Sequence, residues 1–171
     1  ALEGYGGQGP VRIGNAAASQ EQNDSYGSIV LTATQMFADA RLPRAGSVSL
    51  YRHLESIGRT ALDLAFEPDA GLWEFRGRRR VHTHSAAMCW AAVDRLAMIA
   101  RRVGLEDDAA EWASHADRLH ARILDAALVP EEGWLSGAFG EKVADASSFL
   151  LPELGMLRAT DPRFLKTLEV L

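Results

Sequence analysis

The helical spacing of apolar residues is the feature that most constrains how this chain folds. Six stretches between residues 15 and 171 place apolar side chains three and four positions apart. In the clearest stretch, from Tyr26 to Ala40, apolar residues recur at i, i+3, i+4, i+7, i+10, i+11 and i+14. No stretch shows the strict alternation of a half-buried strand. The sequence therefore predicts an all-α protein.

Prolines, glycines and capping residues divide the pattern into six predicted helices. The first pattern starts at residue 15 and ends at Pro43 and Gly46. Ser47 is a typical N-cap for the second helix, Gly104 closes the third, and Asp161 followed by Pro162 starts the sixth. The apolar patterns of the second to sixth helices cover residues 50–65, 84–103, 106–127, 147–157 and 162–171.

Short and long loops alternate between these helices, which indicates an array of α-hairpins. The array is compatible with an α-solenoid, an irregular bundle or part of an α/α toroid, and no fixed repeat period separates these alternatives. If the helices run up and down, the long loops 1–14, 67–84 and 130–146 emerge at one end. Long, aromatic loops at one end of a scaffold are typical of a functional site.

Composition excludes several classes of function. The net charge of −5 gives no basic footprint for nucleic acid or an anionic membrane. The sequence offers neither a membrane-spanning apolar run nor the pattern of a signal peptide. A single cysteine, Cys89, excludes an internal disulfide and fits a reducing, cytoplasmic location. The arginine run at 76 and 78–80 is interpreted as a solvated loop, with phosphate binding as the alternative.

Glu74 is the main catalytic candidate. It follows Trp73 in a glycine-punctuated loop, Asp69 to Gly77. A carboxyl group buried against an indole has a raised pKa, because burial disfavours its charged form, and such a group can act as a general acid. The alternative is a surface glutamate beside a packed tryptophan.

The other histidines, tryptophans and the cysteine near these segments have structural interpretations. His82 and His84 have a spacing that invites a metal site, but on an extended segment they point to opposite faces, and no set of ligands completes a zinc site. We interpret them as hydrogen-bonding or core histidines and expect neither metal nor cofactor. Cys89, Trp90 and Trp112 lie on apolar helix faces and are expected in the core.

Three ordered segments resemble a known family. Residues 4–17, reading GYGGQGPVRIGNAA, look like a loop motif of glycoside hydrolase family 15, which includes glucoamylases, glucodextranases and some bacterial trehalases. Leu72-Trp73-Glu74, followed by residues 82–85, Met88, Trp90 and Asp94-Arg95, is similar to the general-acid segment of that family. Residues 145–157 and 159–162 resemble a later segment of its bacterial members.

The resemblance implies an (α/α)6 toroid that hydrolyses a terminal α-glucosidic bond with inversion. Glu74 would protonate the leaving oxygen, and a second carboxylate, about 6.5–9.5 Å away, would activate water on the opposite face. Trp73 and Arg12 would help to form the sugar pocket; the alternative for Arg12, of equal weight, is that it ties its own loop with hydrogen bonds. Tyr5 and His84 lie in the same loops as these two residues, and Trp134 is assigned to the pocket wall from its loop position alone. The substrate is expected to be an α-glucan or α-glucoside: trehalose, a starch-like oligosaccharide or an isomaltose-like glucan.

The sequence also departs from the family pattern. Gln8-Gly9 and Ser85-Ala86 stand where members often have Ser-Arg and Ser-Lys. The catalytic base of the family lies after the segment that matches residue 171, and its Arg-Asp substrate motif lies before residue 1. We therefore expect residues 1–171 to be a partial catalytic domain, truncated at both ends and inactive alone. Its exposed inner-helix faces predict self-association.

A second class of function remains open from the sequence. A non-catalytic α-helical repeat module that presents a protein-binding surface would show the same helical periodicity. Other α/α toroids act on sugars as epimerases or lyases, but they match the Trp-Glu segment less well.

Overall fold

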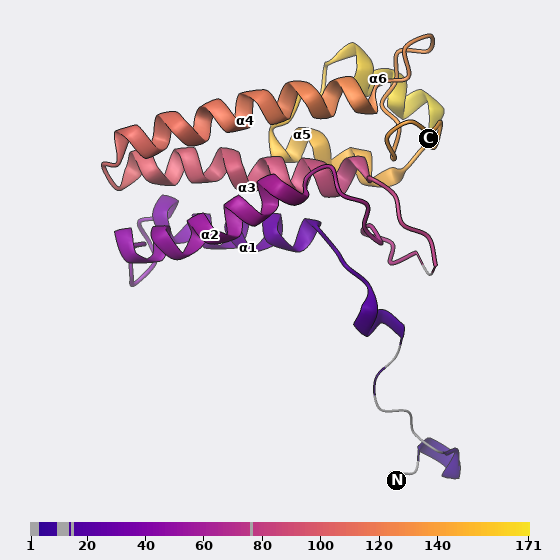
Figure 1. The fold of residues 1–171 in the computed structure, drawn as a ribbon, viewed down its shortest axis with the longest axis horizontal. Coiled ribbons are helices and arrows are strands. Elements are labelled where there is room, and N and C mark those ends of the chain that lie inside the picture. Colours follow the sequence, from indigo (N-terminus) through magenta and orange to yellow (C-terminus); the bar gives the residue numbers. More distant parts are fainter. Residues whose placement is uncertain (1–3, 10–13, 15, 76) are drawn as a thin grey trace.

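The computed structural model describes residues 4–9, 14, 16–75 and 77–171. Within these ranges the chain is all-α, an array of hairpins of the kind that builds an (α/α)6 toroid (Figure 1). The α-helices are α1 (Asp24–Ala38), α2 (Val48–Leu64), α3 (Thr83–Arg102), α4 (Glu106–Ala127), α5 (Leu150–Leu154) and α6 (Pro162–Val170). The 3-10 helices are η1 (Tyr5–Gly7), η2 (Ala16–Ser19) and η3 (Ala146–Phe149).

The helix ends follow the capping signals of the sequence. Ser47 Oγ accepts a hydrogen bond from the Leu50 amide at 3.2 Å, as expected of an N-cap. Asp161 caps α6 in the same way through the Arg163 amide at 2.9 Å. Gly104, with φ 78°, ends α3 in the left-handed conformation, and the Leu105 amide bonds back to the Ala100 carbonyl. These predicted boundaries are confirmed.

Two predicted helices are shorter than the sequence indicated. Residues 20–23 are not helical and lie between η2 and α1. The fifth helix, expected over 147–157, divides into η3 and the short α5. Pro152 lacks the amide that a continuous helix would need, and Gly155 ends α5 at φ 83°.

Helix α3 is the centre of the fold. It packs against α1, α2, α4 and α5, and Figure 1 shows it between α4 and the α1–α2 pair. Its residues 83–93 are buried without exception. Neighbouring helices can approach α3 closely because small residues line the contacts. A Cβ on Gly27 of α1, for example, would lie 2.3 Å from the Met88 carbonyl oxygen.

The residues expected in the core are found there. Trp90, Trp112 and Cys89 are all buried. Burial raises the pKa of the Cys89 thiol to about 12, so the thiol stays protonated and unreactive. Within the described ranges no helix is both long and apolar enough to cross a membrane.

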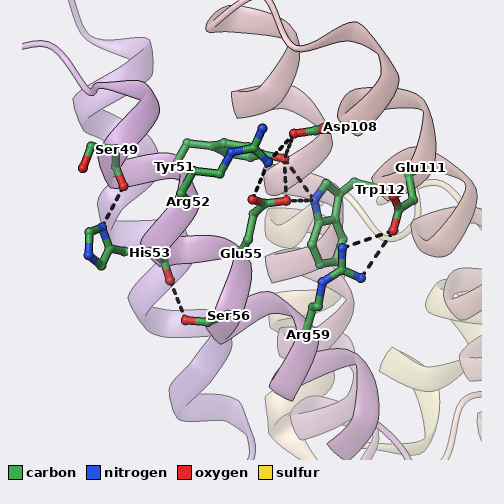
Figure 2. A network of polar contacts seen from close by, with 10 residues as sticks. All are labelled: Ser49, Tyr51, Arg52, His53, Glu55, Ser56, Arg59, Asp108, Glu111 and Trp112. Carbon is green, nitrogen blue, oxygen red and sulfur yellow. Dashed lines mark hydrogen bonds and ion pairs between the residues drawn. The ribbon is translucent and has the colours of Figure 1, made fainter.

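A polar network joins α2 to α4 (Figure 2). Glu55 accepts hydrogen bonds from the Tyr51 hydroxyl at 3.1 Å and from Trp112 Nε1 at 3.3 Å. Arg52 bridges the carboxylates of Glu55 and Asp108, at 2.7 and 2.6 Å. Burial and the charge of Glu55 raise the pKa of Tyr51, so its hydroxyl remains a donor. The network therefore satisfies two buried donors at the start of α4.

Loss of Glu55 should destabilise this interface. In Glu55→Ala two buried donors lose an acceptor, so we expect the free energy of unfolding to fall by about 1–3 kcal/mol. The matched control is Glu111→Ala, which removes a half-exposed ion pair with Arg59 on the same helix pair. Its effect should stay below about 1 kcal/mol. Urea denaturation measures both variants, and equal losses would contradict this account.

Candidate active site

The loop between α2 and α3 carries Trp73 and Glu74 at its tip. The base of the loop is closed by two main-chain hydrogen bonds between Asp69 and Arg80, at 2.9 and 3.1 Å. Inside it, the amides of Glu74 and Phe75 bond to the carbonyls of Gly71 and Ala70, at 3.0 and 3.1 Å. The tip is therefore a tight, internally bonded turn.

Glu74 has a backbone conformation that is unusual for its residue type. Its φ of 52° makes it the one non-glycine residue with a positive φ in the described part of the chain. Gln20 Nε2 donates a hydrogen bond to its carbonyl oxygen at 3.0 Å. The side chain of Glu74 is exposed, so the burial against an indole that the sequence suggested is not found in this chain.

The indole of Trp73 points to the loop between α4 and η3 rather than to Glu74. Trp73 Nε1 donates to both carboxylate oxygens of Asp145, at 3.0 and 3.1 Å. Asp145 Oδ1 also accepts from the Ser147 amide at 2.8 Å. Burial acts to raise the pKa of Asp145, but the hydrogen bonds from Ser147 and Trp73 outweigh it and hold that pKa below its ordinary value.

Main-chain bonds bring two of the predicted loops together. The Thr83 amide bonds to the Gly137 carbonyl and the Phe139 amide to the Val81 carbonyl, both at 3.0 Å. The long loops 67–84 and 130–146 therefore meet at one end of the helices, whereas η1, in the third loop predicted to lie there, is apart from them (Figure 1).

His82 and His84 are both buried but have different surroundings. His82 stacks on Phe75, with 5.9 Å between ring centroids. His84 is 5% exposed, and its Nδ1 lies 3.9 Å from Asp24 Oδ2. Burial lowers the pKa of His84, while the nearby Asp24 acts in the opposite direction. Among the residues that the structure describes, no three His, Cys, Asp or Glu side chains group as metal ligands.

A cavity of about 400 Å³ lies where α1, α3 and α5 come together near the loop. Its polar lining comes from Asp24 and Ser28 of α1, His84 of α3 and Glu153 of α5. Leu72, from the loop that carries Glu74, closes one side. Among the described residues, His84 Nδ1 is buried without a hydrogen-bond partner.

The remaining predicted site residues do not join this group. Trp134 is buried, and its Nε1 donates to Glu132 Oε2 at 2.6 Å within its own loop. Tyr5 is fully exposed in η1, which Figure 1 shows apart from the helices. Arg12 lies outside the described residues.

Comparison with known proteins assigns the chain to a family. The model of "Glycosyl hydrolases family 15" matches residues 1–171. The chain belongs to glycosyl hydrolase family 15. Its similar curated relatives include a trehalase of Thermoplasma volcanium, 34% identical over 98% of the chain. A trehalase of Thermoplasma acidophilum is 35% identical over 98%, and one of Mycobacterium tuberculosis is 36% identical over 97%.

The chain spans about a quarter of the length of these relatives: 26%, 28% and 24%, respectively. No solved structure matches it at a significant level.

Two carboxylates contribute to the site of this family 15 chain although the sequence pattern did not indicate them. One is Asp145, described above. The other is Asp69, which is fully buried. Its Oδ2 accepts from the Asn23 amide at 2.9 Å and from Ser85 Oγ at 2.8 Å, which ties the loop to the starts of α1 and α3. The one available signal was that both aspartates directly flank glycine-rich aromatic loops.

Gly71 should be the least replaceable glycine of the family 15 loop. Its φ is 68°, and an added Cβ would lie 2.7 Å from the His82 ring. Gly77 has a similar φ of 66°, but a Cβ added there would have no heavy atom of the described residues within 4 Å. Gly77→Ala should cost about 1–2 kcal/mol of stability, from backbone strain alone, whereas Gly71→Ala should cost clearly more. Thermal unfolding of the two variants tests the difference, and equal costs would contradict the His82 contact.

Burial of His84 should make stability depend on pH. As the pH falls through about 6.5, the unfolded chain takes up a proton at His84, while the folded chain resists it. The unfolded state then binds more protons, so stability falls until the lowered folded pKa is passed. His84→Gln should flatten this part of a plot of melting temperature against pH, with the comparison referenced to pH 8. An unchanged slope would contradict it.

Proposed function

We propose that the protein containing this chain is an inverting glycoside hydrolase with trehalose as its substrate. Family membership supports hydrolysis of a glycosidic bond, and the trehalases that match nearly the whole chain support the choice of sugar. We further propose that residues 1–171 form part of its catalytic domain.

Glu74 is proposed as the general acid. The observation that carries this proposal is its fixed place at the tip of the loop. The tip is bonded internally, its carbonyl is held by Gln20, and the neighbouring indole is held by Asp145. A proton donor contributes most when its position relative to the leaving oxygen is fixed. The rest of the catalytic domain would cover this tip and supply the burial that the described residues do not.

The proposed reaction breaks the bond between the anomeric carbon of one glucose and the bridging oxygen. Glu74 transfers its proton to that oxygen as the second glucose leaves. A water molecule attacks the anomeric carbon from the opposite face and gives its proton to a second carboxylate, about 6.5–9.5 Å from the acid. We propose that this base lies in the part of the protein that the chain does not include, so that residues 1–171 alone do not turn over substrate.

Sugar contacts are proposed for the residues that the resemblance and the loops single out. Trp73 is 54% exposed and offers a ring face to a pyranose. His84 lines the cavity. Tyr5, Arg12 and Trp134 remain proposals from sequence. For Trp134, whose indole is buried, a role in shaping the loop fits better than direct stacking on sugar.

Replacement of the acid tests the proposal. In the full-length protein, Glu74→Gln should lower kcat on trehalose by about 10²–10⁴-fold, because the amide cannot donate the proton that the carboxylic acid supplies. Glu131→Gln changes another exposed loop glutamate in the same manner and should leave kcat unchanged.

The anomeric configuration of the product tests inversion. NMR of early reaction mixtures should show one β-glucose for every α-glucose released. Initial release of α-glucose alone would exclude inversion. In the preceding experiment, retained turnover of the Glu74→Gln variant would exclude Glu74 as the acid.

A further inference from the structure

The bond between Trp73 and Asp145 joins two loops that are 72 residues apart in the sequence. The indole N–H lies between both carboxylate oxygens, at 3.0 and 3.1 Å. A charged acceptor makes this a stronger contact than a neutral hydrogen bond. Among the described residues Asp145 is the hydrogen-bond partner of the Trp73 side chain, which is otherwise half-exposed.

Asp145 is itself held in place. The Ser147 amide donates to Oδ1, so the carboxylate also caps η3. Gly137 lies directly beneath it, and a Cβ at that position would come within 2.3 Å of Asp145 Cβ. The carbonyl of Gly137 in turn bonds to the Thr83 amide at the start of α3. Asp145 thus packs against Gly137, whose backbone is bonded to the start of α3.

Within the described residues, no comparable contact holds the side chain of Glu74 itself. Its left-handed backbone is disfavoured for a glutamate and persists only if its neighbours impose it. Gln20 holds the carbonyl side of the turn, and Trp73 is the residue immediately before it. Rotation of the indole away from Asp145 would leave the peptide between Trp73 and Glu74 held by the bond from the Glu74 amide to the Gly71 carbonyl, and this weaker restraint would let the direction of the Glu74 side chain change.

We propose that Asp145 is a positioning residue for the general acid: by holding the Trp73 indole, it fixes the direction in which Glu74 presents its proton. This inference rests on the proposed function of Glu74. Asp145 does not touch substrate in this account. Because hydrogen bonds hold its pKa below the ordinary value, it stays charged through the mildly acidic range and keeps both acceptor oxygens.

Leaving groups of different basicity separate this role from a merely structural one. Trehalose releases a sugar alkoxide that requires protonation, whereas α-glucosyl fluoride releases fluoride, which requires little. In the full-length protein, Asp145→Ala should lower kcat/KM on trehalose by about 10–100-fold, as expected for a misplaced catalytic group. On α-glucosyl fluoride the loss should stay below about threefold. Equal losses on both substrates would overturn the proposal.

Two further variants protect the test against simple misfolding. Asp145→Asn keeps one acceptor oxygen for the Ser147 amide and should show the same selective loss on trehalose in weaker form. Gly137→Ala leaves all reacting groups intact but displaces Asp145, so it should act like Asp145→Ala. Its control is Gly140→Ala in the same loop. A Cβ added at Gly140 would have no heavy atom of the described residues within 4 Å, so this variant strains the backbone without displacing Asp145 and should retain activity on trehalose. Equal activity of the two glycine variants would count against the proposal.

A double-mutant cycle tests whether Asp145 acts through Trp73. In the Trp73→Phe background, which lacks the N–H donor, Asp145→Ala should have no further effect beyond about twofold on trehalose. Independent, multiplicative losses would overturn the inference.

Glu74→Gln on the same two substrates separates the two proposals. If it spares trehalose hydrolysis, the proposed function fails; if it shows the selective loss and Asp145→Ala does not, only the positioning role fails.

Discussion

Burial of α3 on every side is the constraint on which the rest of this structure depends. Its residues 83–93 are buried throughout, and α3 contacts α1, α2, α4 and α5, so each of those helices is placed by one element. Alanines at 86, 87, 91 and 92, together with Gly27 on α1, keep the helix axes close. Both loops of the candidate site form main-chain bonds to residues 80–83, which lie immediately before this stretch or at its start. The packing of α3 therefore also positions the candidate site.

The two ends of the helical array use polar groups for different purposes. At the start of α4, carboxylates satisfy buried hydroxyl and indole donors and meet an arginine, an arrangement that joins helices (Figure 2). At the loop end, Asp69 and Asp145 accept from amides, a hydroxyl and an indole, and within the described part of the chain no arginine or lysine side chain bonds to them. They hold loops rather than helices, which is the task that a binding or catalytic surface requires.

The sequence predicted the helices well and the site only in part. Periodicity and caps placed α2, α3, α4 and the start of α6 within a few residues, because those signals are local. The non-helical residues 20–23 were missed, since tertiary contacts such as the hydrogen bond from Gln20 to the loop help to decide them. The Trp73–Asp145 bond spans 72 residues and leaves no periodic trace. The exposure of Glu74 was equally hidden, because a Trp-Glu dipeptide does not reveal which way the indole turns.

The left-handed backbone of Glu74 has a consequence for how this protein responds to selection. Glycine or asparagine would adopt the same conformation with less strain, so either residue should be favoured there by stability alone. A screen for heat resistance that ignores turnover would thus tend to erase this carboxyl group. For the proposed general acid, stability and turnover thus make opposite demands on the residue at position 74.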